Sequence, residues 1–170
     1  MRSGSVSIIA LVETAAGIER ASDIANTSPR LARMAFGAID FCVDIGISLT
    51  DAVDILRHAR SRLVVASRAA RLIAPVDTVF PDLKDDEGLE AEARLAKVLG
   101  FGGKMVIHPC QIEMVNQVFS PSEAELAWAQ KVVEAFDGAE AEGRSAIQVD
   151  GKFIDYAVVA RARQLLEGTC

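Results

Sequence analysis

Residues 7–40, SIIALVETAAGIERASDIANTSPRLARMAFGAID, contain the pattern that decides the fold. An apolar run over residues 7–12 ends at an acidic residue, and a stretch with apolar residues at helical spacing follows it. A Ser-Pro break then precedes a second apolar run over residues 31–36. Short strands that alternate with amphipathic helices are typical of a parallel sheet with right-handed crossovers. The stretch therefore predicts an α/β fold.

The rest of the chain continues this alternation. Residues 53–70 predict a long helix, and apolar runs at 75–80 and 104–107 predict two more strands, each followed by a helix. Arginines in and next to this stretch mostly fall off its apolar stripe: Arg57, Arg60, Arg68 and Arg71. Four β-α units in this order fit either a doubly wound sheet or part of a (β/α)8 barrel. A further helix, a hairpin at 147–154 centred on Asp150-Gly151 and a last helix at about 156–166 complete the prediction.

Composition limits the classes of partner. The chain has 170 residues, 51% of them hydrophobic, so it can bury a core, and its length predicts one domain. A net charge of −6 argues against nucleic acid and anionic membranes as partners. The apolar run at 8–12 is too short for a membrane span or a signal-peptide core. The cysteines Cys42, Cys110 and Cys170 are widely spaced, so we expect free thiols in a reducing cytoplasm.

Two predicted strands end in an acidic residue. Glu13 closes the first, and Asp40 follows the second after a small-residue turn, Gly37-Ala38. Because adjacent parallel strands lie only about 4.8 Å apart, two carboxylates at their ends can reach one cation such as Mg²⁺. The Gly-Ala turn also lets a ligand approach backbone N–H groups. The structural alternative is that Glu13 caps the next helix and Asp40 starts a turn.

Other polar residues favour structural roles. We interpret His108, at the end of the fourth strand, as a structural hydrogen-bonding group rather than a catalyst. Asp77 and Asp82 flank the third strand, where they either hold a loop or touch a ligand. Asp155 follows the hairpin, and its position favours the N-cap of the last helix.

Five ordered motifs resemble those of a known family. They are LVETAAGI (11–18), FGAIDFCVDIG (36–46), PVDTVFPD (75–82), LGFGGKMVIHPCQIEMVNQVFSPS (99–122) and DGKFIDYAVVARAR (150–163). Together they resemble the citrate lyase beta-subunit family of CoA-ester lyases, which includes malyl-CoA and citramalyl-CoA lyases. The resemblance implies the second half of a (β/α)8 TIM barrel, strands five to eight, with a C-terminal helix-hairpin-helix segment. Residues 1–137 would form the partial lyase domain, and residues 138–170 a hairpin and helix that can reach a neighbouring subunit.

The resemblance also assigns roles to individual residues. Glu13 matches a glutamate that binds Mg²⁺ and contacts substrate, and Asp40 matches the second Mg²⁺ ligand. Gly37 and Ala38 match a loop whose backbone meets the carboxylate of an oxoacid. Asp155 matches an acid that acts as a catalytic acid/base on the C-terminal segment.

The implied activity is Mg²⁺-dependent cleavage of a 3-hydroxyacyl-CoA ester of the malyl, citramalyl or citryl type to acetyl-CoA and a 2-oxoacid. Two alternatives remain: a catalytically incomplete half-barrel that serves only in folding or assembly, and a related Mg²⁺-dependent 2-oxoacid aldolase. The family's substrate-binding arginine belongs to the first four strands, and no arginine here matches it. Because four strands leave unpaired edges, we expect a homo-oligomer (trimer or hexamer) or a complementing N-terminal half.

Overall fold

The structure of the chain, a computed structural model, describes residues 6–49 and 53–168. The chain divides into two units, Met1–Phe119 and Ser120–Cys170. We expected the boundary after residue 137, at the end of the predicted helix. That boundary between a lyase domain and a C-terminal segment stays a prediction. The two compact units separate earlier, because the predicted helix, α7 (Glu123–Ala141), packs against the last helix, α8 (Tyr156–Leu166).

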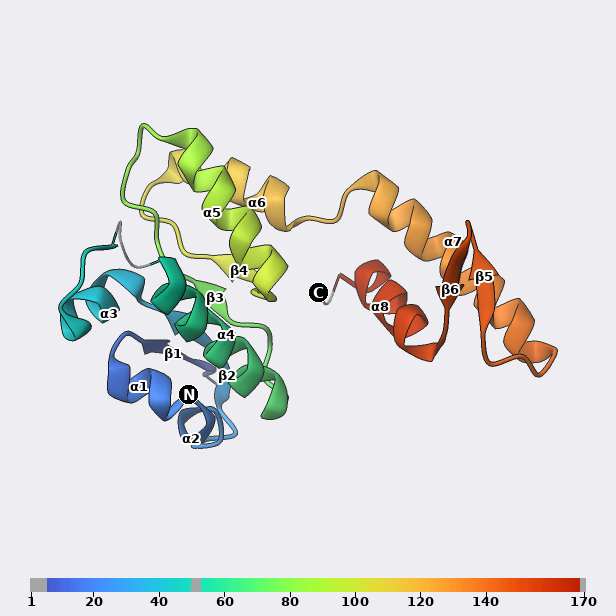
Figure 1. Cartoon of the computed structure of the whole chain (residues 1–170), viewed down its shortest axis with the longest axis horizontal. Coiled ribbons are helices and arrows are strands. Elements are labelled where there is room, and N and C mark those ends of the chain that lie inside the picture. Colours follow the sequence, from blue (N-terminus) through green and yellow to red (C-terminus); the bar gives the residue numbers. More distant parts are fainter. Residues whose placement is uncertain (1–5, 50–52, 169–170) are drawn as a thin grey trace. The chain divides into compact units, whose positions relative to one another are not determined.

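The first unit is an α/β structure built on a four-stranded parallel sheet in the order β1-β2-β3-β4 (Figure 1). The strands are β1 (Ile8–Val12), β2 (Leu31–Phe36), β3 (Val76–Asp77) and β4 (Gly103–Lys104). The helices are α1 (Ala15–Glu19), α2 (Ala21–Ala25), α3 (Ala38–Ile45), α4 (Val53–Ala69), α5 (Asp86–Leu99) and α6 (Ile112–Phe119), with a 3₁₀ turn at Pro109–Gln111. The order of strands and helices confirms the predicted α/β class.

The third and fourth strands are shorter than predicted, at two residues each. The apolar character of residues 75–80 reflects burial of the segment after β3 more than strand pairing. Thr78 lies beyond the ladder and is still only 3% exposed. Hydropathy reports burial, and a buried loop carries the same signal as a buried strand.

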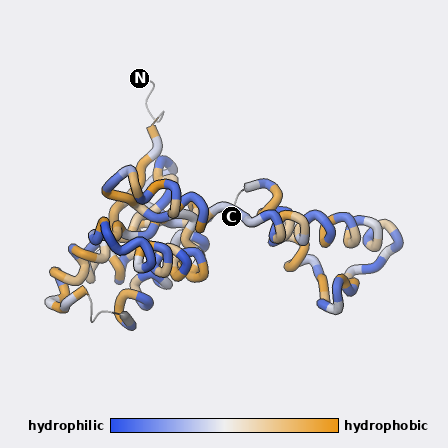
Figure 2. The backbone as a smooth tube through the Cα atoms, turned by 90° about the horizontal axis from the view of Figure 1, so that it is seen from above, coloured by the Kyte–Doolittle hydropathy of each residue, from blue (hydrophilic) through white to orange (hydrophobic). Residues whose placement is uncertain are grey.

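The core of the first unit lies between one face of the sheet and the helices. Val12, Met34 and Phe36 point into it and are buried, whereas Ile9 and Leu11 are 60% and 51% exposed. Successive side chains on a strand point to opposite faces, so the second face of β1 is uncovered in this chain. Hydrophobic and hydrophilic positions alternate along the helices of both units (Figure 2).

The second unit consists of α7, a hairpin and α8. The hairpin pairs β5 (Ile147–Val149) with β6 (Lys152–Ile154) in antiparallel register. Asp150 and Gly151 form its turn with φ of 50° and 75°, which a tight two-residue hairpin requires. The core of this unit comprises Ala129, Val132, Phe136, Val149, Ile154, Val159 and Ala162.

Two further predictions concern thiols and membranes. Cys42 is a buried free thiol and Cys110 an exposed one, whereas Cys170 lies outside the described residues. Within residues 6–49 and 53–168, no helix is both long and apolar enough to cross a membrane.

Candidate active site

The carboxyl ends of β1 and β2 meet at one edge of the sheet. Val12 pairs with Phe36, and the Gly37 N–H donates to the Val12 carbonyl oxygen at 3.0 Å. The next residue on β1 is Glu13, and its side chain lies directly against Gly37. A Cβ atom added to Gly37 would stand 2.6 Å from Glu13 Cβ and 2.8 Å from its Oε2. Only glycine therefore leaves room for the Glu13 carboxylate at this point.

Asp40 follows the same end of β2, in the first turn of α3, whose N-cap is Gly37. Glu13 is half-buried and Asp40 is exposed. In the part of the chain that the structure describes, neither carboxylate has a hydrogen-bond or ion-pair partner. Such carboxylates are suitable ligands for a hard cation. Among the described residues no group of three or more metal-binding side chains occurs, so water or substrate would complete the coordination.

The loop that carries Glu13 is fixed on its other side by α1. Thr14 is the N-cap of α1, and its Oγ1 accepts the Gly17 N–H at 3.1 Å. The Ala15 N–H donates to Asp44 Oδ2 at 2.8 Å, which ties the start of α1 to α3. Thr14 thus takes the capping role that the structural alternative gave to Glu13, and the Glu13 carboxylate is left without a structural task.

The four N–H groups at the start of α3, which have no partner within the helix, divide into two pairs. Gly37 donates to Val12, and the Ala38 N–H donates to Thr78 Oγ1 at 3.0 Å. The N–H groups of Ile39 and Asp40 have no partner among residues 6–49 and 53–168. The resemblance pointed to the backbone of Gly37 and Ala38 as the carboxylate-binding loop, but the free donors lie one and two residues further along.

A buried cluster of four charges, Arg60, Asp77, Glu92 and Lys104, lies next to this edge. Arg60 donates to Asp77 through Nε at 2.8 Å and Nη2 at 3.1 Å, and to Glu92 Oε1 at 2.6 Å. Lys104 Nζ lies 3.1 Å from Glu92 Oε1 and 3.5 Å from Asp77 Oδ2. Burial alone lowers the pKa of Arg60, but hydrogen bonds and charge from Asp77 and Glu92 outweigh it and raise the pKa. The cluster joins α4, β3, α5 and β4.

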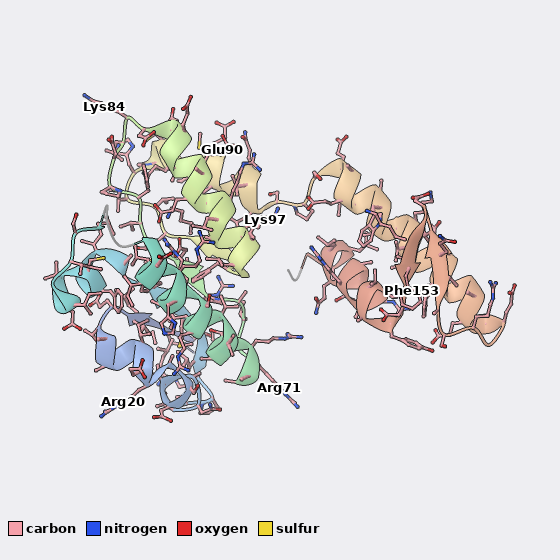
Figure 3. The ribbon with its side chains drawn as sticks, in the orientation of Figure 1. Arg20, Arg71, Lys84, Glu90, Lys97 and Phe153 are labelled. Atoms are coloured by element: carbon pink, nitrogen blue, oxygen red, sulfur yellow. The ribbon has the colours of Figure 1, made fainter. Side chains whose placement is uncertain are left out.

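Sequence reasoning missed Arg60, which is 4% exposed, whereas Arg71, just past the end of α4, is exposed (Figure 3). The signal was present in the spacing, since Arg60 falls four residues after Leu56 and three before Leu63. This spacing places a residue on the buried side of a helix. The residues that neutralise Arg60 come from other elements, and no local pattern announces them.

A cavity of about 340 Å³ adjoins the start of α3. Ala38 and Ile39 border it on one side, and Thr78 and Phe80 from the segment after β3 on another. Arg60 is the cationic group in its lining. The cavity thus lies between the start of α3, the segment after β3 and the charge cluster.

Asp155 belongs to the second unit, where it caps α8 as its position predicted. Its Oδ1 accepts the N–H groups of Ala157 and Val158 at 3.0 and 3.1 Å. Asp155 is half-buried, and its Oδ2 has no partner in the described ranges. The carboxylate therefore keeps one oxygen that can accept a proton or a hydrogen bond.

The remaining polar candidates have structural contacts. His108 Nδ1 accepts the Cys110 N–H at 3.2 Å and lies 3.0 Å from Cys110 Sγ, which supports the structural interpretation of this histidine. Asp82 Oδ1 accepts the Lys84 N–H at 2.9 Å and so holds a loop. Asp77, the other acid beside β3, is the fully buried partner of Arg60.

The chain is similar to known proteins. Residues 1–109 match the model of the HpcH/HpaI aldolase/citrate lyase family. The chain is 39% identical over 164 residues to the citrate lyase subunit beta of Leuconostoc mesenteroides subsp. cremoris. It is 34% identical over 182 residues to the L-malyl-CoA/beta-methylmalyl-CoA lyase of Cereibacter sphaeroides. These matches cover 96% and 97% of the chain, but only 54% and 57% of the two relatives.

A solved structure agrees with this relationship. The chain superimposes with a TM-score of 0.80 and 36% identity on the protein CitE from Mycobacterium tuberculosis, in complex with magnesium, acetoacetate and coenzyme A. The match covers 96% of this chain and 61% of that protein. The chain therefore spans a little more than half the length of the relatives it matches.

Proposed function

The chain belongs to the HpcH/HpaI aldolase/citrate lyase family, and we propose that it supplies the metal-binding edge of a Mg²⁺-dependent carbon–carbon lyase. The substrate would be a CoA ester of a 3-hydroxy acid of the malyl, citramalyl or citryl type, cleaved to acetyl-CoA and a 2-oxoacid. The observation that carries the proposal is the placement of Glu13 and Asp40 at one sheet edge without other partners. The magnesium, acetoacetate and coenzyme A of the related CitE structure support it.

Glu13 and Asp40 would hold the cation. The cradle fits, because the absence of a Cβ at Gly37 leaves space for Glu13 Oε2, and both ligands are carboxylates, which Mg²⁺ prefers. When bound, Mg²⁺ would stabilise negative charge on the substrate oxygens during cleavage. We assign no further structural task to either side chain.

The start of α3 would bind the carboxylate of the oxoacid. The free N–H groups of Ile39 and Asp40 can donate to it, and the N-terminus of a helix favours an anion. Gly37 and Ala38 would contribute shape instead. Gly37 leaves space for Glu13, and Ala38, which is 0% exposed, holds the turn against the β3 segment.

Asp155 would transfer a proton to or from the acetyl methyl carbon through Oδ2, its free oxygen. Its Oδ1 is held by two N–H groups, so the carboxylate has a fixed orientation. We propose that it acts on the active site of a neighbouring subunit.

The active site would need a second body. The chain spans 54% to 57% of two relatives, and the exposed Ile9 and Leu11 leave one face of β1 uncovered. We propose that a homo-oligomer (trimer or hexamer) or the N-terminal half of a family member covers this face. The substrate-binding arginine would come from such an N-terminal half, because no arginine of this chain matches it. The free thiols Cys42 and Cys110 favour a cytoplasmic location.

Release of acetyl-CoA from malyl-CoA and citramalyl-CoA tests the proposal, with and without Mg²⁺ and with and without the N-terminal half of a family member. Activity should require Mg²⁺ and disappear in Glu13→Gln and Asp40→Asn. A matched control is Glu19→Gln, at the exposed end of α1, which should retain full activity. Activity that survives Glu13→Gln would reject the site. Inactivity in every combination would favour a half-barrel that serves only in folding or assembly. Cleavage of free 2-oxoacids, without cleavage of CoA esters, would favour the related aldolase.

A further inference from the structure

We propose that Thr78 is a positioning residue that fixes the start of α3, and with it Asp40, by accepting the Ala38 N–H. The inference rests on the proposed metal site and adds a residue that lies outside it. Thr78 belongs to the segment after β3, 40 residues along the chain from Ala38, and its Oγ1 lies 3.0 Å from the Ala38 nitrogen.

The need for Thr78 follows from a conflict at position 37. A helix is usually capped by Ser, Thr, Asp or Asn at the N-cap, whose side chain accepts an N–H group of the first turn. Here the N-cap is Gly37, which makes no side-chain cap, and any side chain there would collide with Glu13. The site therefore requires glycine where α3 requires a cap. Thr78 resolves the conflict by supplying the accepting oxygen from a different element.

Thr78 can hold α3 because it is itself held. Thr78 is 3% exposed, and its carbonyl oxygen accepts a hydrogen bond from Lys104 Nζ at 2.9 Å. Lys104 is fixed in turn by Glu92 at 3.1 Å and by Asp77, the residue before Thr78, at 3.5 Å. The buried charge cluster is thereby connected through one residue to the helix that carries Asp40.

Loss of the Thr78 hydroxyl would affect the metal ligands without removing any of them. Ala38 is 0% exposed, so its N–H would be left buried and unpaired, and the first turn of α3 would shift or loosen to find a partner. Asp40 lies in that turn. Outer contacts that orient a metal ligand typically change metal affinity by about 10- to 100-fold when removed.

The test compares three variants of the 170-residue chain by Mn²⁺ titration, with electron paramagnetic resonance to count the free ion. Thr78→Val keeps the shape and removes the acceptor, so it should weaken Mn²⁺ binding about tenfold or more. Thr78→Ser keeps the hydroxyl and should bind within about threefold of the parent chain. Thr27→Val is the matched control, because the exposed Thr27 hydroxyl also bonds to backbone, the Ile24 carbonyl, away from the site. It should leave affinity unchanged.

Hydrogen exchange of backbone amides gives a second readout that needs no metal. Thr78→Val should speed exchange in the first turns of α3 at least tenfold, and Thr78→Ser and Thr27→Val should not. If Thr78→Val fails to fold, Thr78→Cys replaces it, since sulfur is only a weak acceptor. Unchanged exchange in α3 would overturn the inference. The inference would also be overturned if Thr78→Val bound Mn²⁺ as tightly as the parent chain while Glu13→Gln abolished binding. Binding that Glu13→Gln leaves intact would instead reject the metal site of the proposed function.

Discussion

Replacement of Asp77 by alanine should destabilise the first unit more than any loss of a surface ion pair. The Asp77 side chain is 0% exposed, and its two oxygens accept Arg60 at 2.8 and 3.1 Å. Lys104, also with a 0% exposed side chain, lies 3.5 Å from it. Alanine would leave two buried cations with one carboxylate between them, that of Glu92.

The size of the stability loss depends on the charges that remain buried after the substitution. Removal of one partner of a buried ion pair typically costs about 3–5 kcal/mol, because the other charge stays buried. Glu92 stays within 2.6 Å of Arg60 and 3.1 Å of Lys104, and its side chain is 24% exposed, which places the loss near the lower end. We expect about 3 kcal/mol. With a urea dependence of about 2 kcal/mol per molar, the midpoint should fall by roughly 1.5 M.

Urea unfolding at one fixed protein concentration measures this loss. Far-UV circular dichroism is the appropriate signal, because the single tryptophan, Trp128, lies in the second unit. Glu90→Ala breaks an exposed pair with Arg94 on α5 and should cost less than about 0.5 kcal/mol.

A double variant separates charge from shape. Arg60→Met with Asp77→Leu removes both members of the pair and leaves Glu92 and Lys104 together, so it should recover to within about 1 kcal/mol of the parent chain. The reasoning would be refuted if Asp77→Ala cost no more than Glu90→Ala. It would also be refuted if the double variant were less stable than Asp77→Ala.

Four more outcomes are expected. Gly37→Ala should weaken Mn²⁺ binding and lower the free energy of unfolding by about 1–3 kcal/mol. Gly138→Ala, where the added Cβ meets open space, should stabilise the chain slightly. Equal effects of the two substitutions would contradict the close approach of Glu13 to Gly37. Asp155→Ala should lower the free energy of unfolding by about 1 kcal/mol, because α8 loses its N-cap. Asp155→Ser should restore the thermal stability, because serine can cap the helix, but it should not restore catalytic activity. Burial raises the pKa of the Cys42 thiol. The unfolded chain then releases that proton first, so the free energy of unfolding should fall as pH rises above about 8.5, and Cys42→Ala should remove this part. Cys110 should react with a thiol reagent in the folded chain, and Cys42 only after unfolding, as peptide mass spectrometry would show.

Much of the fold could be predicted because its signals are local. Apolar runs mark β1 and β2, and Asp150-Gly151 predicts the hairpin, since both residues tolerate positive φ. The N-cap role of Asp155 follows from its position before a helical pattern. The order of Glu13 and Asp40 after successive strands also predicts a shared metal site, and that site stays a prediction.

Other features depend on which elements pack together, and the sequence by itself does not determine them. The unit boundary falls before α7 because the buried face of that helix meets α8 and the hairpin. Helical spacing could place Arg60 on a buried face, but only the approach of β3, α5 and β4 provides the charges that neutralise it.

The sequence alone determined the order of strands and helices, the hairpin turn and local caps such as that of Asp155, because periodicity and backbone preference act over a few residues. The tertiary structure alone decided which polar groups at that edge are already used. The Ala38 N–H is taken by Thr78 and the Gly37 N–H by Val12, which leaves the donors of Ile39 and Asp40 free. A hydrogen bond between residues 40 positions apart depends on how two elements pack, and neither segment carries a local trace of it.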